Sequence, residues 1–567
     1  MQRRRFLQPV PLLLVAVLVI VMFWPLVEGV RGAFFGAGDT PTFGYVLRVF
    51  RNPIYVEGLE NALLVAVLST AVGAVLGVAS ALLVDRFDFP AKRVLSALVP
   101  LPLIVPPFVG AIGVKQLLGQ SGALNALLVD LHLLSGSQPV DWLRRGRLTA
   151  VVVLTALHLY PIVYFYVAAA LTNLNAEMEE AAHNLGCVGL RALRKITLPL
   201  ILPSLFAACA IAFIGALTEF GVPLVCDYPR ITSVQIFYGL KDMDRNPSAH
   251  VLVMVVLFGS IVLYGAARAL FRRRSSATSQ KGTRRCRPRR GSPAVTASCV
   301  GFLGSLIGLS ALPNVGVVLA AFGQDWYGTV LPSGVTLEHF RAALGQEMVV
   351  SAIGNSLRYV VLSTLLDLVL GTTIAWYVAR ARSPVTRLLD TAAMVPLVVP
   401  GLVMAFGYLA ISRDGRPLAF LNPVRDPTPL LVIAYAVRRL PFVVRSAVAG
   451  IEQLDIALED AAASLGARRA HVIVRITLPL LAPHLLSATI FVFALSMLEV
   501  SDSLILAQKQ ATYPITKAIY ELFQLLGEGR QMAAALGVWA MLFLATAIVL
   551  ARSLMIKRVP QGQAQKL

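Results

Sequence analysis

Runs of about 20 apolar residues, each long enough to cross a hydrocarbon core roughly 30 Å thick, recur along the whole chain. Clear examples cover residues 10–27, 252–270 and 532–550. Only 14% of the 567 residues are charged, whereas a typical soluble protein has roughly 25%. We therefore predict an all-α membrane protein with about twelve transmembrane helices.

The basic residues fall mainly in every second loop between the apolar runs, although the net charge is +20. This distribution follows the positive-inside rule and places both termini in the cytoplasm. The loop 120–147, with Arg144, Arg145 and Arg147, is an exception. No single basic face with interleaved aromatics is present, which argues against nucleic acid and favours membrane lipid as the partner of these charges. The five cysteines show no disulfide or metal-ligand spacing.

A charged segment that interrupts the apolar pattern occurs twice. EEAAHNLGCVGLRALRKITLPLILP runs from Glu179 to Pro203, and EDAAASLGARRAHVIVRITLPLLAP runs from Glu459 to Pro483, 280 residues later. Upstream positions such as Asn61 and Asn355 repeat at a spacing of 294. The chain is therefore a duplication. An even number of spans in each half predicts two parallel six-helix repeats, at 1–271 and 294–567, joined by a basic cytoplasmic linker at 272–293.

Both copies of this segment, near 175–199 and 455–479, are predicted to form a helix-turn-helix on the cytoplasmic side. A short helix from 175 to 185 ends at Gly186, which can adopt a positive φ, and a second amphipathic piece follows. Pro199 then occupies the first turn of the next membrane helix. The alternative is a simple spacer, but a spacer has no physical need for this pattern twice, so we expect a docking surface for another protein.

The pattern E-A-A, three residues, G, nine residues, I-x-L-P resembles the "EAA" loop of binding-protein-dependent ABC importer permeases. The second copy has Asp460 where the family usually has Glu. The resemblance covers about 61–270 and 355–550, and fused two-copy chains of this length are similar to the ferric-iron and thiamine branch. It implies the type I ABC importer permease fold. The residues it assigns to the coupling loops are Glu179, Glu180, Ala181, Ala182 and Gly186, and Glu459, Asp460, Ala461, Ala462 and Gly466.

In that family the loop sits in an ATP-binding subunit, so the resemblance implies two copies of such a subunit and a periplasmic substrate-binding protein as partners. This chain has no G-x-x-x-x-G-K-[ST] loop. ATP and Mg are therefore expected on the partner ATPase, and no cofactor, metal or enzymatic activity is expected in this chain. The implied location is the bacterial inner membrane. Iron(III) is the expected substrate, with a phosphonate, a sugar phosphate or thiamine as alternatives.

Six ionisable residues at membrane depth are candidates for the translocation pathway, because such groups are costly there. They are His158, Glu219, Arg438, Arg439, Glu499 and Asp502. Glu219 and Glu499 are equivalent, and similar importers for ferric iron, sulfate and polyamines also carry an acid there. The alternatives are a structural hydrogen bond for the acids, and snorkelling or pairing with an acid such as Asp367 for the arginines. Pro102, Pro106, Pro396 and Pro400 are expected to interrupt the third spans.

Two other classes of protein fit the sequence less well than an importer. A secondary transporter of two six-helix halves driven by an ion gradient has no reason to duplicate the charged loop between its fourth and fifth spans. A membrane enzyme is disfavoured because the sequence shows no metal-ligand spacing and no pairing of a nucleophile with a base.

Overall fold

The structure is a computed structural model, and it describes residues 9–35, 40–103, 106–134, 139–172, 174, 176–240, 243, 246–275, 289–381 and 383–558. Nine helices in these ranges are long and apolar enough to cross a membrane, and two sharply bent helix pairs raise the number to eleven if each is one span. The helix α21 (Thr428–Gln453) matches α9 (Arg147–Thr172) in position and length but carries Arg438 and Arg439. The described residues are mostly helical and hold nine to eleven candidate spans, which confirms the all-α membrane fold.

The chain divides into two units that are described separately: unit 1 comprises Met1–Pro41 and Phe340–Leu567, and unit 2 comprises Thr42–His339. Helices of unit 2 besides α9 are α3 (Gly44–Arg51), α4 (Pro53–Arg86), α5 (Lys92–Leu98), η3 (Leu101–Leu103), α6 (Pro107–Leu118), α7 (Ala123–Asp130), α8 (Trp142–Arg145), α10 (Ala176–Asn184), α11 (Leu190–Ala192), η4 (Leu193–Thr197), α12 (Leu198–Leu217), α13 (Gly221–Val225), α14 (Thr232–Gly239), α15 (Ser248–Ser275) and α16 (Pro293–Phe322). Its core lies where α4, α9, α12 and α16 meet around Tyr160 and Leu303.

Unit 1 repeats this organisation. Besides α21, its helices are α1 (Pro9–Leu18), η2 (Val19–Phe23), α2 (Trp24–Arg31), α17 (Glu338–Leu344, which begins at the end of unit 2), α18 (Glu347–Arg380), α19 (Pro384–Met394), η6 (Val395–Leu397), α20 (Gly401–Ser412), η7 (Ala419–Leu421), α22 (Ile456–Ser464), α23 (Arg469–Val472), η8 (Ile473–Thr477), α24 (Leu478–Met497), α25 (Ser501–Leu506), η9 (Gln510–Thr512), α26 (Ile515–Gln524) and α27 (Gly529–Arg558). The helices α18, α21 and α24 pack together as α4, α9 and α12 do in unit 2.

The few strands are short and lie in unit 2. The parallel pair β1 (Phe87–Asp88) and β2 (Arg289–Arg290) aligns Phe87 with Arg289, and the antiparallel pair β3 (Gly323–Gln324) and β4 (Gly334–Val335) aligns Gly323 with Val335. The first pair joins the end of α4 to the segment just before α16. The middle of the predicted linker, 276–288, lies outside the described residues.

The prolines interrupt the third span of each half, as predicted. In unit 1 the segment Pro384–Leu397 meets α20 at an angle of 103°, and Pro400 precedes α20 in an extended conformation. In unit 2, η3 ends at Leu103 and α6 begins after Pro106, which is extended in the same way. A proline cannot donate the backbone hydrogen bond of a helix interior, so these positions favour a break in both units.

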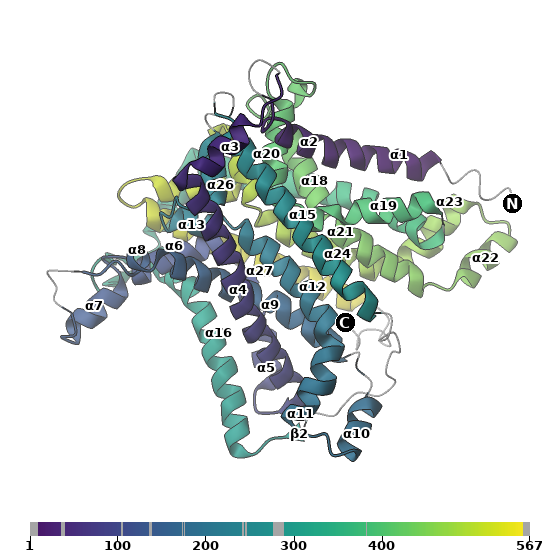
Figure 1. Cartoon of the computed structure of the whole chain (residues 1–567), viewed down its shortest axis with the longest axis horizontal. Coiled ribbons are helices and arrows are strands. Elements are labelled where there is room, and N and C mark those ends of the chain that lie inside the picture. Colours follow the sequence, from purple (N-terminus) through teal and green to yellow (C-terminus); the bar gives the residue numbers. More distant parts are fainter. Residues whose placement is uncertain are drawn as a thin grey trace. The chain divides into compact units, whose positions relative to one another are not determined.

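The first helices of each sequence copy pack in the unit formed mainly by the other copy. The helix α16 opens the second copy but packs against α6 in unit 2, while α1 and α2 open the first copy but pack against α19 and α20 in unit 1. Figure 1 shows α1 running beside α19. The predicted domains at 1–271 and 294–567 are sequence repeats, and the packed units have different boundaries. The domain boundaries therefore stay a prediction about the repeats.

Close backbone contact explains why these helices pair in this way. A Cβ on Gly113 of α6 would lie 2.1 Å from the Pro313 carbonyl oxygen of α16, and a Cβ on Gly407 of α20 would lie 2.5 Å from the Pro25 carbonyl oxygen of α2. Apolar side chains gain little from leaving lipid for another apolar helix, so membrane helices associate where small residues let backbones approach. The two glycines, matched by the duplication, select the same packing in both units.

Candidate functional site

The repeated charged segment of unit 2 forms the predicted helix-turn-helix. The helix α10 ends at Asn184, Gly186 has a φ of +77°, and α11 and η4 lead into α12. The N–H of Cys187 donates to the carbonyl oxygen of Ala182 at 2.9 Å. The bond runs from the N–H to the carbonyl oxygen five residues earlier and encloses a glycine with a positive φ. This is a common C-cap, and it satisfies one of the last carbonyl groups of the helix. Pro199 lies in the first turn of α12, as expected.

The matching loop in unit 1 has the same geometry. The side chain of Asp455 caps α22 by accepting from the Ala457 N–H at 3.0 Å. Gly466 has a φ of +85°, and the N–H of Ala467 donates to the Ala462 carbonyl oxygen at 3.0 Å. We call the two loops, 176–197 and 456–477, the paired loops. Their backbone agreement confirms the helix-turn-helix prediction in both copies.

The paired loops present matching side chains to their surroundings. Ala182 and Ala462 are buried, at 8% and 9% exposed, and support the turn from inside. The side chain of Glu179 lies outside the described part of the chain. The exposed pairs are Glu180 and Asp460, Ala181 and Ala461, and Leu185 and Leu465. Leu185 and Leu465 are 87% and 89% exposed, and sequence reasoning missed them, although an apolar residue before the turn glycine at the same place in both copies was a readable signal.

The first acid of the duplicated segment has an internal contact in unit 1. Glu459 Oε1 accepts from Arg380 Nη2 at 3.1 Å and from Thr477 Oγ1 at 3.3 Å. Arg380 is the last residue of α18, and Thr477 ends η8. The side chain of Glu459, which the resemblance assigns to the coupling loop, is only 18% exposed and faces α18. Its neighbour Asp460 faces outward.

Four of the six predicted pathway residues meet in a buried cluster in unit 1. Arg438 and Arg439 of α21 both form ion pairs with Glu499, and Arg438 also lies 3.7 Å from Asp502. The Arg438–Glu499 distance is 2.7 Å, and the side chain of Glu499 is 4% exposed. Pairing of the arginines with an acid, one of the two alternatives, is therefore confirmed. The acid that pairs is Glu499. Asp367 is fully buried in α18, and its carboxylate makes no hydrogen bond within the described residues.

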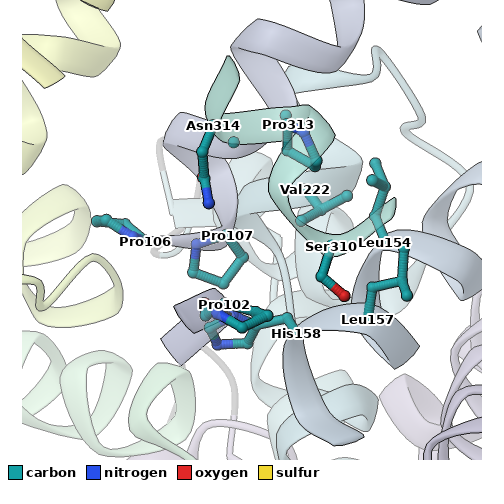
Figure 2. Close-up of a pocket in the computed structure, with 12 residues that line it drawn as sticks. Pro102, Pro106, Pro107, Leu154, Leu157, His158, Val222, Ser310, Pro313 and Asn314 are labelled. Carbon is teal, nitrogen blue, oxygen red and sulfur yellow. Dashed lines mark hydrogen bonds between the residues drawn. The ribbon is translucent and has the colours of Figure 1, made fainter. Parts of the chain in front are cut away.

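The corresponding position in unit 2 holds a small cavity of about 40 Å³. The Nδ1 of His158 donates to the Pro102 carbonyl oxygen at 2.9 Å, and in a neutral ring this bond makes Nε2 the acceptor. Figure 2 shows Pro102 and His158 on one side of the cavity and Asn314 of α16 on the other. A space of this volume with polar groups in its wall has room for ordered water.

Glu219, the equivalent of Glu499, adjoins this cavity in unit 2. Its Oε1 accepts from the Val222 N–H at 3.1 Å, and Val222 lines the cavity. The structure thus brings His158 and Glu219 into one region and the other four pathway candidates into another, at equivalent places in the two units. Whether any of the six contacts the transported substrate stays a prediction.

Nine to eleven candidate spans among the described residues, a chain duplication and two loops of matching backbone geometry define a duplicated membrane protein. A family model described as "binding-protein-dependent transport system inner membrane component" matches this chain twice, over residues 73–276 and 367–563. These matches cover more than half of the chain and include both paired loops. The chain belongs to this family, and it is a multi-pass ABC importer permease with two permease repeats in one polypeptide.

Curated relatives cover either the whole duplication or one repeat. The "ferric transport system permease protein FbpB" of Actinobacillus pleuropneumoniae is 27% identical over 468 residues, which are 81% of this chain and 64% of that protein. The "sulfate transport system permease protein CysT" of Salmonella typhimurium is 30% identical over 220 residues, 38% of this chain and 76% of that protein. A crystal structure of a bacterial transporter that imports the acidic polysaccharide alginate aligns with a TM-score of 0.41 and 19% identity, over 48% of this chain and 96% of its own.

Proposed function

We propose that this chain receives a substrate from a periplasmic binding protein and moves it into the cytoplasm by ATP-driven alternating access. ATP and Mg are bound, and ATP is hydrolysed, by separate ATP-binding subunits, because the sequence contains no phosphate-binding loop of its own. The chain lies in the inner membrane with both termini in the cytoplasm, as the basic loops favour. The permease itself has no enzymatic role.

The observation that carries this proposal is the geometry of the paired loops. Each presents a short helix, a left-handed glycine and one very exposed leucine, Leu185 or Leu465. Exposed apolar residues on a rigid projection are typical of a surface that another protein covers. Since one polypeptide carries both loops, one copy of this chain binds two ATP-binding subunits.

Assembly tests this proposal. When the chain is co-expressed with a candidate ATP-binding subunit from the same genome, we expect a purified complex with one permease chain and two ATP-binding chains. Native mass spectrometry or light scattering of the detergent complex measures this ratio. A complex with two permease chains would contradict the proposed stoichiometry. Failure of any ATP-binding subunit to bind, together with transport by the permease alone along an ion gradient, would instead support the secondary transporter.

We propose iron(III) as the substrate. A relative aligned along 81% of this chain is named as a ferric transport permease. The case for a phosphonate or sugar phosphate rested on Arg438 and Arg439, and both guanidinium groups form ion pairs with Glu499. This pairing reduces their positive potential toward an anion, because the carboxylate charge lies in direct contact with them. Thiamine remains an alternative with no separate observation in its favour.

The ligand specificity of the partner binding protein tests the iron(III) assignment. We expect it to bind iron(III), supplied as ferric citrate, with a dissociation constant of micromolar or below, and to ignore alkylphosphonates and sugar phosphates at the same concentration. Isothermal titration calorimetry of the purified binding protein measures both. If it binds an organophosphate or thiamine and not iron(III), the iron assignment is wrong, while the importer mechanism stands.

A further inference from the structure

Three side chains connect the loop of unit 1 to the membrane helices behind it. We call Arg380, Glu459 and Thr477 the clasp. One carboxylate oxygen of Glu459 accepts from both other residues, the Arg380 and Glu459 side chains are each 18% exposed, and Thr477 is 1% exposed. A partly buried, charge-assisted hydrogen bond is stronger and more directional than an ion pair in water. The clasp therefore holds α22 to the end of α18 and to the start of α24.

The clasp residue Arg380 is itself held in place. Its guanidinium carbon lies 5.9 Å from the centre of the Trp376 ring, one turn earlier in α18. This cation–π contact keeps the guanidinium at the helix end. Arg380 is therefore presented to Glu459 as a fixed group.

The other end of α18 is bonded to a distant loop. The Asn355 side chain donates to the Ala511 carbonyl oxygen at 2.8 Å, and the Tyr359 hydroxyl donates to the Thr512 carbonyl oxygen at 3.0 Å. Ser356 accepts from the Ile515 N–H at 2.7 Å. From Asn355 to Arg380 the helix is about 37 Å long, at 1.5 Å per residue. One continuous helix thus joins the clasp to residues 511–515 on the other side of the membrane span.

Unit 2 has a related connection, in which the arginine at the helix end bonds directly to the threonine. Arg86 ends α4 and donates to the Thr197 hydroxyl at 2.7 Å. These two residues match Arg380 and Thr477, which end α18 and η8 in unit 1. At the other end, the Asn61 side chain donates to the Arg230 carbonyl oxygen at 2.8 Å. Thr197 is fully buried. Both units therefore share the arginine and the threonine at this end of the helix and a side-chain bond at the other end.

We propose that Glu459 is a positioning residue for energy coupling: through Arg380 and Thr477 it transmits displacement of the loop 456–477 along α18 to residues 511–515. This inference rests on the proposed function, in which an ATP-binding subunit moves that loop. A rigid helix bonded at both ends passes on a displacement that a loosely attached loop would absorb. Asp460 then serves contact with the ATP-binding subunit, and Glu459 serves transmission.

The test measures the accessibility of residues near 511–515, at the far end of α18, while the nucleotide bound to the ATP-binding subunits is changed. Gln510→Cys is introduced after the native cysteines are replaced by alanine, and its maleimide labelling rate is compared between nucleotide-free and ADP-vanadate-trapped complexes. We expect the rate to respond to nucleotide in this parent protein. Glu459→Gln should reduce the response by about tenfold, within the usual range of coupling energies, while ATP-binding subunits still co-purify and hydrolyse ATP.

Matched variants separate transmission from stability. Glu452→Gln makes the same chemical change on an exposed side chain near the end of α21 and should leave the response intact. The exchange Arg380→Glu with Glu459→Arg should restore part of the response lost in either single variant. Thr477→Val removes one hydroxyl and should weaken the labelling response by a smaller factor. If Glu459→Gln does not fold, the response of Thr477→Val tests the transmission role instead.

Each outcome has a distinct meaning. An unchanged response in Glu459→Gln, or in Thr477→Val when the former is unfolded, overturns the inference. Loss of the ATP-binding subunits in Glu459→Gln also overturns it, because Glu459 would then be a docking contact. If the parent protein binds no ATP-binding subunit or shows no response to nucleotide, it is the proposed function that fails.

Discussion

Replacing Gly186 and Gly466 together by proline is expected to abolish binding of the ATP-binding subunits and transport, while the chain still inserts into the membrane. Both glycines have a positive φ, at +77° and +85°, and proline is restricted to a φ of about −65°. The turn cannot form with proline, and in unit 1 the Gly466 N–H that donates to Ala463 at 3.0 Å is lost as well.

The loops lie at the ends of membrane helices, so their disruption leaves the apolar spans that drive insertion unchanged. Co-purification of the ATP-binding subunits and uptake into proteoliposomes measure the loss, and protease accessibility in membrane vesicles measures insertion. Uptake at the parent rate in the double proline variant would remove the coupling role of the paired loops.

Alanine at the same two positions provides the matched control. A Cβ at Gly186 or Gly466 meets no atom within 4 Å among the described residues. Its cost is therefore conformational, about 1–2 kcal/mol per loop for a left-handed residue. We expect the double alanine variant to retain reduced transport. Equal loss in the alanine and proline variants would indicate that glycine is required for contact with a partner and not for the turn.

Replacing Glu499 by glutamine is expected to destabilise the protein by about 3–5 kcal/mol, because it leaves buried positive charges without their partner. Glu499 is the shared acceptor for Arg438 and Arg439, and it also accepts from the Ser501 N–H at 3.1 Å. Glutamine keeps the shape and one acceptor oxygen but loses the negative charge. The change should lower the thermal unfolding midpoint in detergent and the yield of folded protein.

Glu219→Gln is the control at the equivalent position of unit 2. In unit 2 the residues that match Arg438 and Arg439 are His158 and Leu159. Glu219 accepts from the Val222 N–H, and the amide oxygen of glutamine can keep this bond. A loss of about 1 kcal/mol is expected, because the bond is kept but is no longer strengthened by the carboxylate charge. If the two variants have the same unfolding midpoint, the ion pairs of unit 1 contribute nothing beyond that bond.

Much of the architecture could be predicted from local pattern. Apolar run length and loop charge indicated the spans, because a lipid environment imposes both requirements on any sequence. The turns at Gly186 and Gly466 were readable because glycine at a helix end has few other uses. The proline breaks before α6 and α20 followed from the missing N–H of that residue. Because the chain is duplicated, each of these features occurs in both copies, which strengthens each inference.

The partners of the ionisable residues were not readable in the same way. The sequence placed Arg438, Glu499 and Asp367 at similar membrane depth, but which of two acids an arginine meets depends on how α21 is rotated against its neighbours. The resemblance assigned both Glu459 and Asp460 to the coupling loop, but adjacent residues on a helix point in directions about 100° apart. Only the packed helices show that Glu459 faces Arg380.

Sequence alone therefore established a duplicated membrane permease and the position of its two paired loops, since membrane thickness, glycine and proline act within a few residues. The tertiary structure decided that α16 and α1–α2 pack with the opposite repeat and that the buried charges meet as Arg438, Arg439 and Glu499. Apolar helices in lipid carry little sequence information about their neighbours. Their partners are chosen by close contacts such as that of Gly113 with Pro313, which form only when the helices pack.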